Sequence, residues 1–221
     1  MYPPLTSDQL VHLPTVISAP RFATYLREKN NDKRAALDLY HWNLQISAAL
    51  LVPLHIVEVS TRNAIVEAIE AIHGGTWPWT QGFIRSLTDP GSPAYSPKRD
   101  LSLCAQRHPT AGKVVAELKF VFWEKMLTSR FQNRLWDQQF FAVFPDCPRI
   151  MQSSQGRARL REDIERVRKL RNRIAHHEPI FSRHIRDDLE GIMRCIRWRN
   201  QAAASWVEEI ETVTAFLRIR P

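Results

Sequence analysis

The sequence predicts an all-α protein, and two observations carry this prediction. Apolar residues recur at intervals of three and four along most of the chain, and no run alternates strictly between apolar and polar residues as a half-buried strand would. Helix-breaking residues are concentrated, since residues 74 to 112 hold five of the fourteen prolines and five of the seven glycines. A chain of 221 residues with 44% hydrophobic content can bury one sizeable core. We therefore expect a single helical domain, residues 1–221, with an irregular Pro/Gly-rich insertion at about 74–112.

Capping residues mark the first predicted helices. The run Ser18-Ala-Pro20 is typical of a helix start, because Ser caps free amides and Pro gives up no hydrogen bond near the first helical position. This helix should run to about Lys29. Asn31 or Asp32 should cap a second helix, which Pro53 should kink or end. The apolar surface of that helix is formed by Ala36, Leu39, Trp42, Leu44, Ile46 and Leu50.

The next helix should begin at Leu54 and stop at Gly74-Gly75. Its apolar residues keep helical spacing: Val57, Thr61, Ile65, Ala68, Ile69 and Ile72. The insertion follows and carries Trp77, Trp79 and Phe83. These rings could stack on bases, but anchoring a long loop to the core is the commoner use of such residues.

Helical spacing resumes after the insertion. Further helices are expected over residues 114–136, 157–176 and 183–203. Phe140, Phe141 and Phe144 precede a break at Pro145-Asp-Cys-Pro148. Ser205 followed by Glu208 resembles a capping box for the last helix.

The chain is basic, with a formal net charge of +8, and the excess is local. Between Arg149 and Arg199 there are fourteen Lys and Arg residues against seven Asp and Glu residues. Such an excess attracts a polyanion by long-range steering and counter-ion release. An ordinary solvated helix face has the same composition, so charge alone leaves both interpretations open.

Cysteine usage and hydropathy predict the compartment. Cys104, Cys147 and Cys195 lie far apart and form no pair typical of a metal knuckle or a redox motif, so we expect free thiols in a reducing compartment. The start, Met-Tyr-Pro-Pro, has no basic segment followed by an apolar run, and the longest apolar stretch, Ile46 to Leu54, is short. We expect a cytoplasmic protein that does not span a membrane. No phosphate loop and no metal-ligand spacing is present, so neither cofactor nor metal is expected.

One residue breaks the apolar pattern of the predicted 157–176 helix. Its apolar stripe follows a helical progression of Leu160, Ile164, Val167 and Ile174. Arg171 stands eleven residues after Leu160 and therefore points within about 20° of it on an ideal helix. A guanidinium that faces the interior needs a partner or a functional role. We expect either a salt bridge, to Glu58 or Glu162, or a functional site.

Arg171 also opens the string Arg171-Asn-Arg-Ile-Ala-His176-His-Glu-Pro-Ile-Phe181. An Arg and a His separated by four to six residues are the signature of HEPN nucleases, but about two or three such pairs are expected by chance in a chain this rich in Arg. Arg171 pairs in this way with His176 and with His177, and Arg34 pairs with His41. An apolar residue follows Arg34, and we treat that pair as a coincidence.

The surrounding residues carry a more specific signal. The string from Arg171 to Phe181 resembles the motif of the Abi-like (abortive infection) branch of the HEPN superfamily. The resemblance continues, in family order and over about residues 18 to 200, in Leu39-Tyr-His-Trp-Asn43, Val57-Glu58-Val-Ser-Thr-Arg62-Asn63 and Gly112-Lys-Val-Val-Ala-Glu-Leu-Lys-Phe-Val-Phe-Trp123. The element Val121-Phe122-Trp123 departs from the Gly-containing version that the family would show.

The resemblance implies a helical bundle that forms a homodimer and acts as a metal-independent endoribonuclease in phage defence or a toxin-like system. Arg171 and His176 match the family's catalytic pair, and Asn172 matches the polar residue after the Arg. RNA is then the partner, and an antitoxin or a regulatory RNA is a further candidate. The basic residues Arg168, Lys169 and Arg173 would belong to an RNA-facing surface. The alternative is a non-catalytic RNA- or protein-binding module, or a purely structural dimer, with the same fold.

The residue types suit metal-free RNA cleavage, in which the 2′-hydroxyl attacks the adjacent phosphate. The reaction needs a group that transfers protons near neutral pH and a cation that neutralises the phosphorane. Arg171 and His176 are about 140° apart on an ideal helix and do not share a face. Pro179 disfavours helix at Glu178, so the helix should end near His176, and either a turn or a second subunit completes the site. His177 is the alternative base, although a capping or surface role is the commoner one for such a residue.

A second helix could support this site. Glu58 and Arg62 are four residues apart and can pair on one helix face. If that helix packs beside the 157–176 helix, Glu58 would hold Arg171 and Arg62 would add a phosphate contact.

Overall fold

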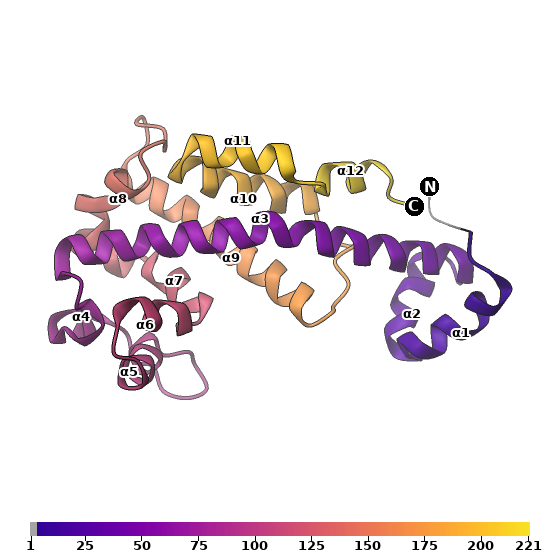
Figure 1. Cartoon of the computed structure of the whole chain (residues 1–221), viewed down its shortest axis with the longest axis horizontal. Coiled ribbons are helices and arrows are strands. Elements are labelled where there is room, and N and C mark those ends of the chain that lie inside the picture. The colour runs from indigo at the N-terminus through magenta and orange to yellow at the C-terminus, as the bar shows by residue number, and fades with distance from the viewer. Residues whose placement is uncertain (1–3) are drawn as a thin grey trace.

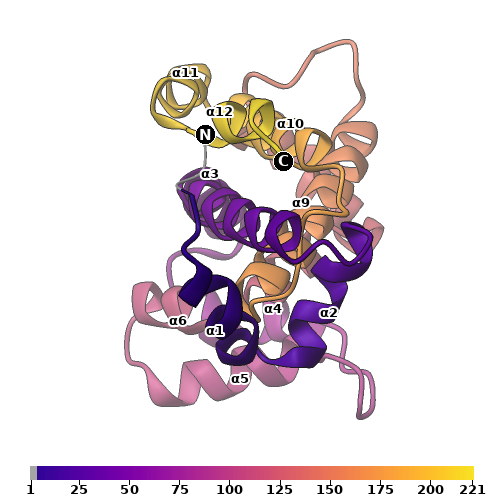
Figure 2. The ribbon, with the colours of Figure 1, turned by 90° about the vertical axis from the view of Figure 1, so that its right-hand side faces the viewer.

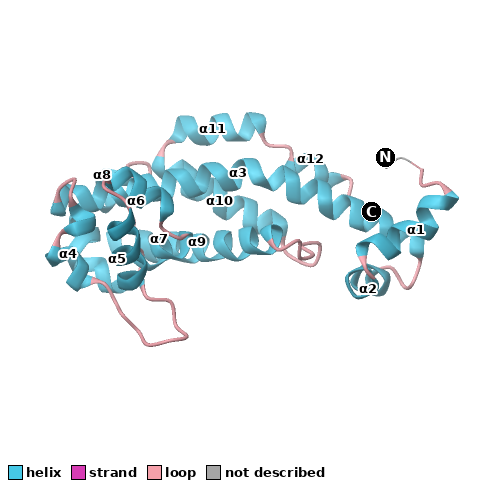
Figure 3. Ribbon diagram, turned by 60° about the horizontal axis from the view of Figure 1, so that its bottom comes forward, coloured by secondary structure: helices cyan, strands magenta, loops and turns pink. Residues whose placement is uncertain are grey.

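The computed structural model describes residues 4–221, and every regular element in this range is helical, which confirms the all-α prediction (Figure 3). Figure 1 shows one helix, α3 (Lys33–His73), along the length of the molecule. Seen along α3 in Figure 2, α10 (Ile185–Arg199), α11 (Gln201–Ile210) and α12 (Val213–Arg218) lie above it, and α9 (Ser153–Ala175) lies alongside. The buried apolar residues of these elements form one cluster.

The central helix α3 begins and ends where the sequence predicts. The Asp32 carboxylate accepts hydrogen bonds from the backbone N–H groups of Arg34 (2.9 Å) and Ala35 (3.0 Å). Gly74 closes the helix with a φ of +74°, a conformation that favours glycine. The helix continues through Pro53 to His73, so neither an end at Pro53 nor a separate helix from Leu54 is found. Along its length α3 packs against α2 (Ala19–Glu28), α8 (Asp137–Val143), α10 and α12, and this burial outweighs the roughly 3 kcal/mol cost of an internal proline.

Within residues 4–221, α3 is the one helix whose length and hydropathy would let it cross a membrane. Core packing accounts for part of that hydropathy, because Trp42, Ile46 and Leu50 are buried. Leu44 and Leu51 are instead about half exposed, at 51% and 53%. The α3 helix therefore has a core face and a second, partly apolar face that this chain leaves open.

The N-terminal region holds one helix that the sequence did not predict. The helix α1 (Ser7–Ile17) begins at a capping box in which the backbone N–H of Gln9 donates to Thr6 Oγ1 (3.2 Å) and that of Thr6 donates to Gln9 Oε1 (2.9 Å). None of its residues is fully buried, although Leu10, Leu13 and Ile17, at helical spacing, pack against the core. The predicted helix after Ser18 is present as α2, although the Ser18 side chain makes no capping hydrogen bond.

The insertion is more helical than predicted. It contains a 3₁₀ turn, Trp77–Trp79, and the helices α4 (Gln81–Ser86), α5 (Pro97–Arg107) and α6 (Ala111–Glu117). Its glycines and prolines mostly separate or start these short helices, as Pro97 does after the Ser96 cap. Trp77 and Phe83 are buried, as expected of anchors, whereas Trp79 is 38% exposed.

The predicted helix over 114–136 is broken. After α6, Leu118 and Lys119 are extended, and α7 (Phe120–Met126) follows. A 3₁₀ turn (Ser129–Phe131) and a π-helical turn (Gln132–Trp136) then lead into α8. One straight helix has a single apolar stripe, whereas the breaks let apolar residues all along this segment reach the core.

The predicted helix from Arg183 to Ala203 is also two helices. Asn200 is extended, with φ −165° and ψ 120°, and its side chain accepts a hydrogen bond from the backbone N–H of Ala203 at 2.8 Å. It therefore ends α10 and caps α11. Ser205 and Glu208 lie inside α11, so the predicted capping box there is wrong.

Candidate functional site

The α9 helix ends just before His176, as the sequence predicts. The backbone N–H of His177 donates to the carbonyl of Ile174 (3.0 Å), and that of Glu178 donates to the carbonyl of Arg173 (2.8 Å). These two bonds form a Schellman motif. His177 occupies the left-handed position of this motif, with φ +56°. Glycine usually takes this position, and the conformation costs any other residue on the order of 1–3 kcal/mol.

The loop after this turn is fixed to α3. The side-chain oxygen of Asn43, which is buried, accepts a hydrogen bond from the backbone N–H of Ile180 at 2.8 Å. Arg173 donates from Nε (3.1 Å) and Nη2 (2.7 Å) to the carbonyl of Pro179. Asn43 therefore helps to position the two histidines. Sequence reasoning named it only within a family-like string, and a polar residue on the apolar side of α3 was the signal that could have identified it.

The side chain of Arg171 does not face the interior, so that prediction is wrong. It is 48% exposed. The neighbouring Leu170 is fully buried and takes the core position, while Ile174 is only half-buried. The apolar stripe therefore shifts in the last turns of α9, where the helix runs out of the core and towards solvent (Figure 1).

Glu58 of α3 does hold Arg171, as expected if the two helices pack together. Arg171 Nε lies 3.7 Å from Glu58 Oε2, and the Glu58 side chain is 29% exposed. The other candidate partner, Glu162, lies near Arg159 instead. The ion pair is thus a half-exposed contact between two helices.

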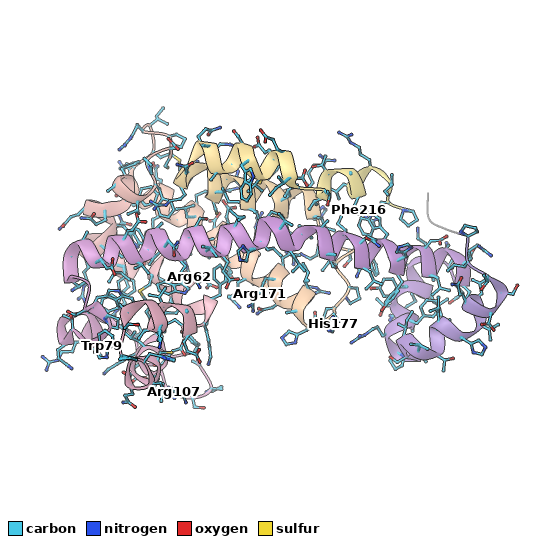
Figure 4. All side chains as sticks on the ribbon, viewed as in Figure 1. Arg62, Trp79, Arg107, Arg171, His177 and Phe216 are labelled. Carbon is cyan, nitrogen blue, oxygen red and sulfur yellow. The ribbon has the colours of Figure 1, made fainter. Side chains whose placement is uncertain are left out.

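The expected pair of Glu58 with Arg62 is not formed, because the Glu58 carboxylate turns to Arg171. Within residues 4–221, Arg62 Nε is buried and has no hydrogen-bond partner. Figure 4 shows Arg62 and Arg171 on the same side of α3 in that view, with His177 further along at the end of α9. The site therefore holds one guanidinium oriented by a carboxylate and a second whose Nε is unpaired.

The two histidine side chains are exposed, and in the described part of the chain neither forms a hydrogen bond or an ion pair. Asn172 is half-buried, and its carbonyl accepts from the backbone N–H of His176 at 2.9 Å. No contact within residues 4–221 joins Arg171 to His176. One chain therefore supplies an accessible cation and accessible imidazoles without bringing them into contact.

The residues predicted to face RNA are all engaged with the protein. Arg168 Nε donates to Glu124, whose side chain is only 3% exposed. Lys169 pairs with Glu165 at 2.6 Å, and its side chain remains 57% exposed. Arg173 holds the Pro179 carbonyl and lies 3.6 Å from Glu178.

Two further arginines of α9, Arg157 and Arg159, bind groups within the fold. Arg157 is buried and donates to the carbonyl of Leu127 at 2.6 Å. Arg159 and Arg194 both pair with the buried Asp163, at 3.4 and 2.8 Å. Arg166 is exposed and forms no ion pair with the described residues. Part of the local excess of positive charge is therefore used inside the fold, while Arg166 and Lys169 remain exposed on α9.

Neither a cluster of metal ligands nor a thiol adds to the candidate site within residues 4–221. Within residues 4–221, no three His, Cys, Asp or Glu side chains gather as a metal site requires. All three cysteines are unpaired and buried, and burial raises the pKa of the Cys147 thiol to about 11. None of them lies at the end of α9.

No family model, no curated protein and no solved structure matches this chain.

Proposed function

We propose that this protein is a metal-independent endoribonuclease in which Arg171, Asn172 and His176 act on RNA. The observation that carries the proposal is the end of α9, where a strained turn leaves two unpaired imidazoles in solvent close after an exposed Arg that Glu58 orients. Strain of this kind is found most often at functional sites. The resemblance to the Abi-like HEPN family supplies the reaction and a role in phage defence or a toxin-like system.

The chemistry follows from these groups. The 2′-oxygen forms a bond to the adjacent phosphorus as its proton passes to a base, and the bond from phosphorus to the 5′-oxygen breaks as that oxygen takes a proton. An imidazole such as that of His176 can take and give these protons near neutral pH. The Arg171 guanidinium neutralises the charge on the phosphorane. The products are a 2′,3′-cyclic phosphate and a 5′-hydroxyl.

A second copy of the chain would complete the site. Arg171 and His176 make no contact in one chain, whereas Leu44, Leu51, Glu58 and Arg62 share one face of α3, since their spacing keeps them within about 40° on an ideal helix. The two leucines are half exposed. An apolar stripe that continues into the site suits a homodimer whose partner contributes the missing groups.

The alternative function is a non-catalytic RNA- or protein-binding module, which the separation of Arg171 from His176 in one chain favours. The two are distinguished by incubating the purified protein with total RNA, with and without EDTA, and by analysing the fragment ends. Cleavage that survives EDTA and leaves 2′,3′-cyclic phosphates supports the endoribonuclease. Intact RNA that remains bound supports the binding module, and cleavage that EDTA abolishes contradicts the metal-free mechanism.

A further inference from the structure

A groove of about 1070 Å³ lies between the insertion and the α7–α9 part of the fold. Its walls are the loop between α4 and α5 (visible in Figure 3), residues of α7 with the turn after it, and Arg168 of α9. Its volume reaches the upper end of the roughly 300–1000 Å³ typical of ligand sites. Arg168 is three residues before Arg171, or about 4.5 Å along the helix axis, and eight residues before His176, or about 12 Å, so the groove and the proposed catalytic groups share one helix.

The groove is electropositive. Its lining includes the cations Lys125, Arg130 and Arg168 and one carboxylate, Asp89. Asp89 is already bound by Arg99, which does not line the groove. Behind the lining, the single carboxylate of Glu124 serves both Arg168 and Lys125, the latter at 3.8 Å. Arg130 forms no ion pair with residues 4–221, and its Nε donates to the carbonyl of Ser86 at 2.8 Å. An anion is therefore the complementary charge.

The groove lining also contains apolar residues and a positioned aromatic ring. Tyr95 is half-buried, and its hydroxyl donates to Asp100 at 2.6 Å. Burial, together with this hydrogen bond, raises the pKa of Tyr95 well above its usual range, so the ring stays neutral. The loop that carries it is fixed, because Arg99 donates to the carbonyl of Pro90 at 2.7 Å and Ser96 donates to Asp89 at 2.7 Å. The ring is thus held in place beside the cations.

We infer that this groove binds a segment of single-stranded RNA, with an unpaired base on the Tyr95 ring and the backbone phosphates on Lys125, Arg130 and Arg168. Cations and an aromatic ring in one groove are the usual combination for single strands, because every base has a face that can stack. In a duplex the bases are already stacked and paired, so no base is available to stack on Tyr95. The inference rests on the proposed function, since it assigns the path by which the substrate reaches Arg171 and His176.

Two matched pairs of variants test the groove in the full-length protein that also carries His176→Ala, so that the probe is not cut. The probe is a fluorescein-labelled 12-residue oligouridine. Tyr95→Leu removes the ring and should weaken binding about 5- to 100-fold, the range of one stacked base, whereas Tyr95→Phe keeps the ring and should bind within about twofold of the parent. Circular dichroism establishes that each variant is folded.

The charge is tested by the salt dependence of binding. Lys125→Ala should reduce the slope of log K against log salt concentration by about 0.7, the value for one lost phosphate contact on a single strand. Lys113→Ala, on the exposed part of α6 outside the groove, should leave the slope unchanged.

The outcomes separate the inference from the proposed function. If Tyr95→Leu and Lys125→Ala bind like the parent, or if an RNA duplex of the same length binds as tightly, the groove assignment is overturned, even where the wild-type protein cleaves RNA. If the groove variants lose binding but the wild-type protein never cleaves, the assignment holds and the endoribonuclease proposal fails.

Discussion

Two arginines on the same helix, three residues apart, should differ sharply in what they contribute to stability. Arg171 and Glu58 are 3.7 Å apart, with side chains 48% and 29% exposed. Exposed pairs of this kind contribute about 0.2–1 kcal/mol, so Arg171→Ala should lower the free energy of unfolding by less than about 1 kcal/mol. Arg171 is therefore free to act on a ligand at little cost to the fold.

Arg168 has the opposite environment. Its removal would leave the Glu124 carboxylate, 3% exposed, with only Lys125 at 3.8 Å. Breaking a buried pair costs about 3–5 kcal/mol, and the remaining lysine should keep Arg168→Ala near the lower end of that range. Charge reversal at Arg168 is consequently an unsuitable test of RNA binding, because it would destabilise the fold first.

The measurement is urea unfolding followed by tryptophan fluorescence, at one protein concentration, since the stability of a dimer depends on concentration. Lys169→Ala removes only an exposed pair within α9 and is the control. A double-mutant cycle with Glu58→Gln should give a coupling energy below about 1 kcal/mol with Arg171. The reasoning is refuted if Arg171→Ala costs as much as Arg168→Ala, or if Arg168→Ala costs no more than the control.

Four further outcomes are expected. Leu51→Glu places a charge on the open apolar face of α3 and should shift a dimer to monomer in light scattering, and an unchanged dimer would place the interface elsewhere. Mixing Arg171→Ala with His176→Ala should restore part of the activity if each site takes residues from both copies, and two inactive proteins that stay inactive together would contradict a shared site. Gly156→Ala would set a Cβ 2.5 Å from the buried Phe140 ring and should cost about 1–3 kcal/mol, whereas Gly82→Ala, with no atom within 4 Å, should fold normally. Burial raises the pKa of the Cys147 thiol from about 9 to about 11, so the folded protein favours the neutral thiol. The resulting stabilisation is fully present below pH 9 and is lost as the pH rises from 9 through 11. A melting temperature that stays constant over this pH range would contradict the burial of Cys147.

Local chemistry made part of this fold predictable. The cap at Asp32, the stop at Gly74 and the end of α9 near His176 all depend on residues within one turn of the boundary, and each was predicted. The breaks at Leu118 and Asn200 were missed, because apolar spacing continues across them and only tertiary packing shows which side each turn faces. Pro53 was misjudged for the same reason, since burial along α3 outweighs a local cost.

In the candidate site, too, some features could be predicted from the sequence and others depend on tertiary packing. The pairing of Arg171 with Glu58 was anticipated from the residue types, but the expected burial of Arg171 was not found, because Leu170 took the core position. The pairing of Arg168 with a buried carboxylate could not be foreseen, since Glu124 lies forty-four residues away in the chain. Long-range partners of charged residues are set by the fold, and a net charge counted along the sequence does not show which charges remain available.

The most direct test of the account compares the parent protein with His176→Ala in two measurements on the same RNA, the single-turnover cleavage rate and the binding affinity. A side chain that transfers protons in an exposed turn should cost about two to four orders of magnitude in rate when removed, with affinity changed by no more than about twofold. His41→Ala, from the other Arg/His pair in the sequence, is the control and should cleave like the parent. Cleavage by His176→Ala at the parent rate would contradict the assignment of this site.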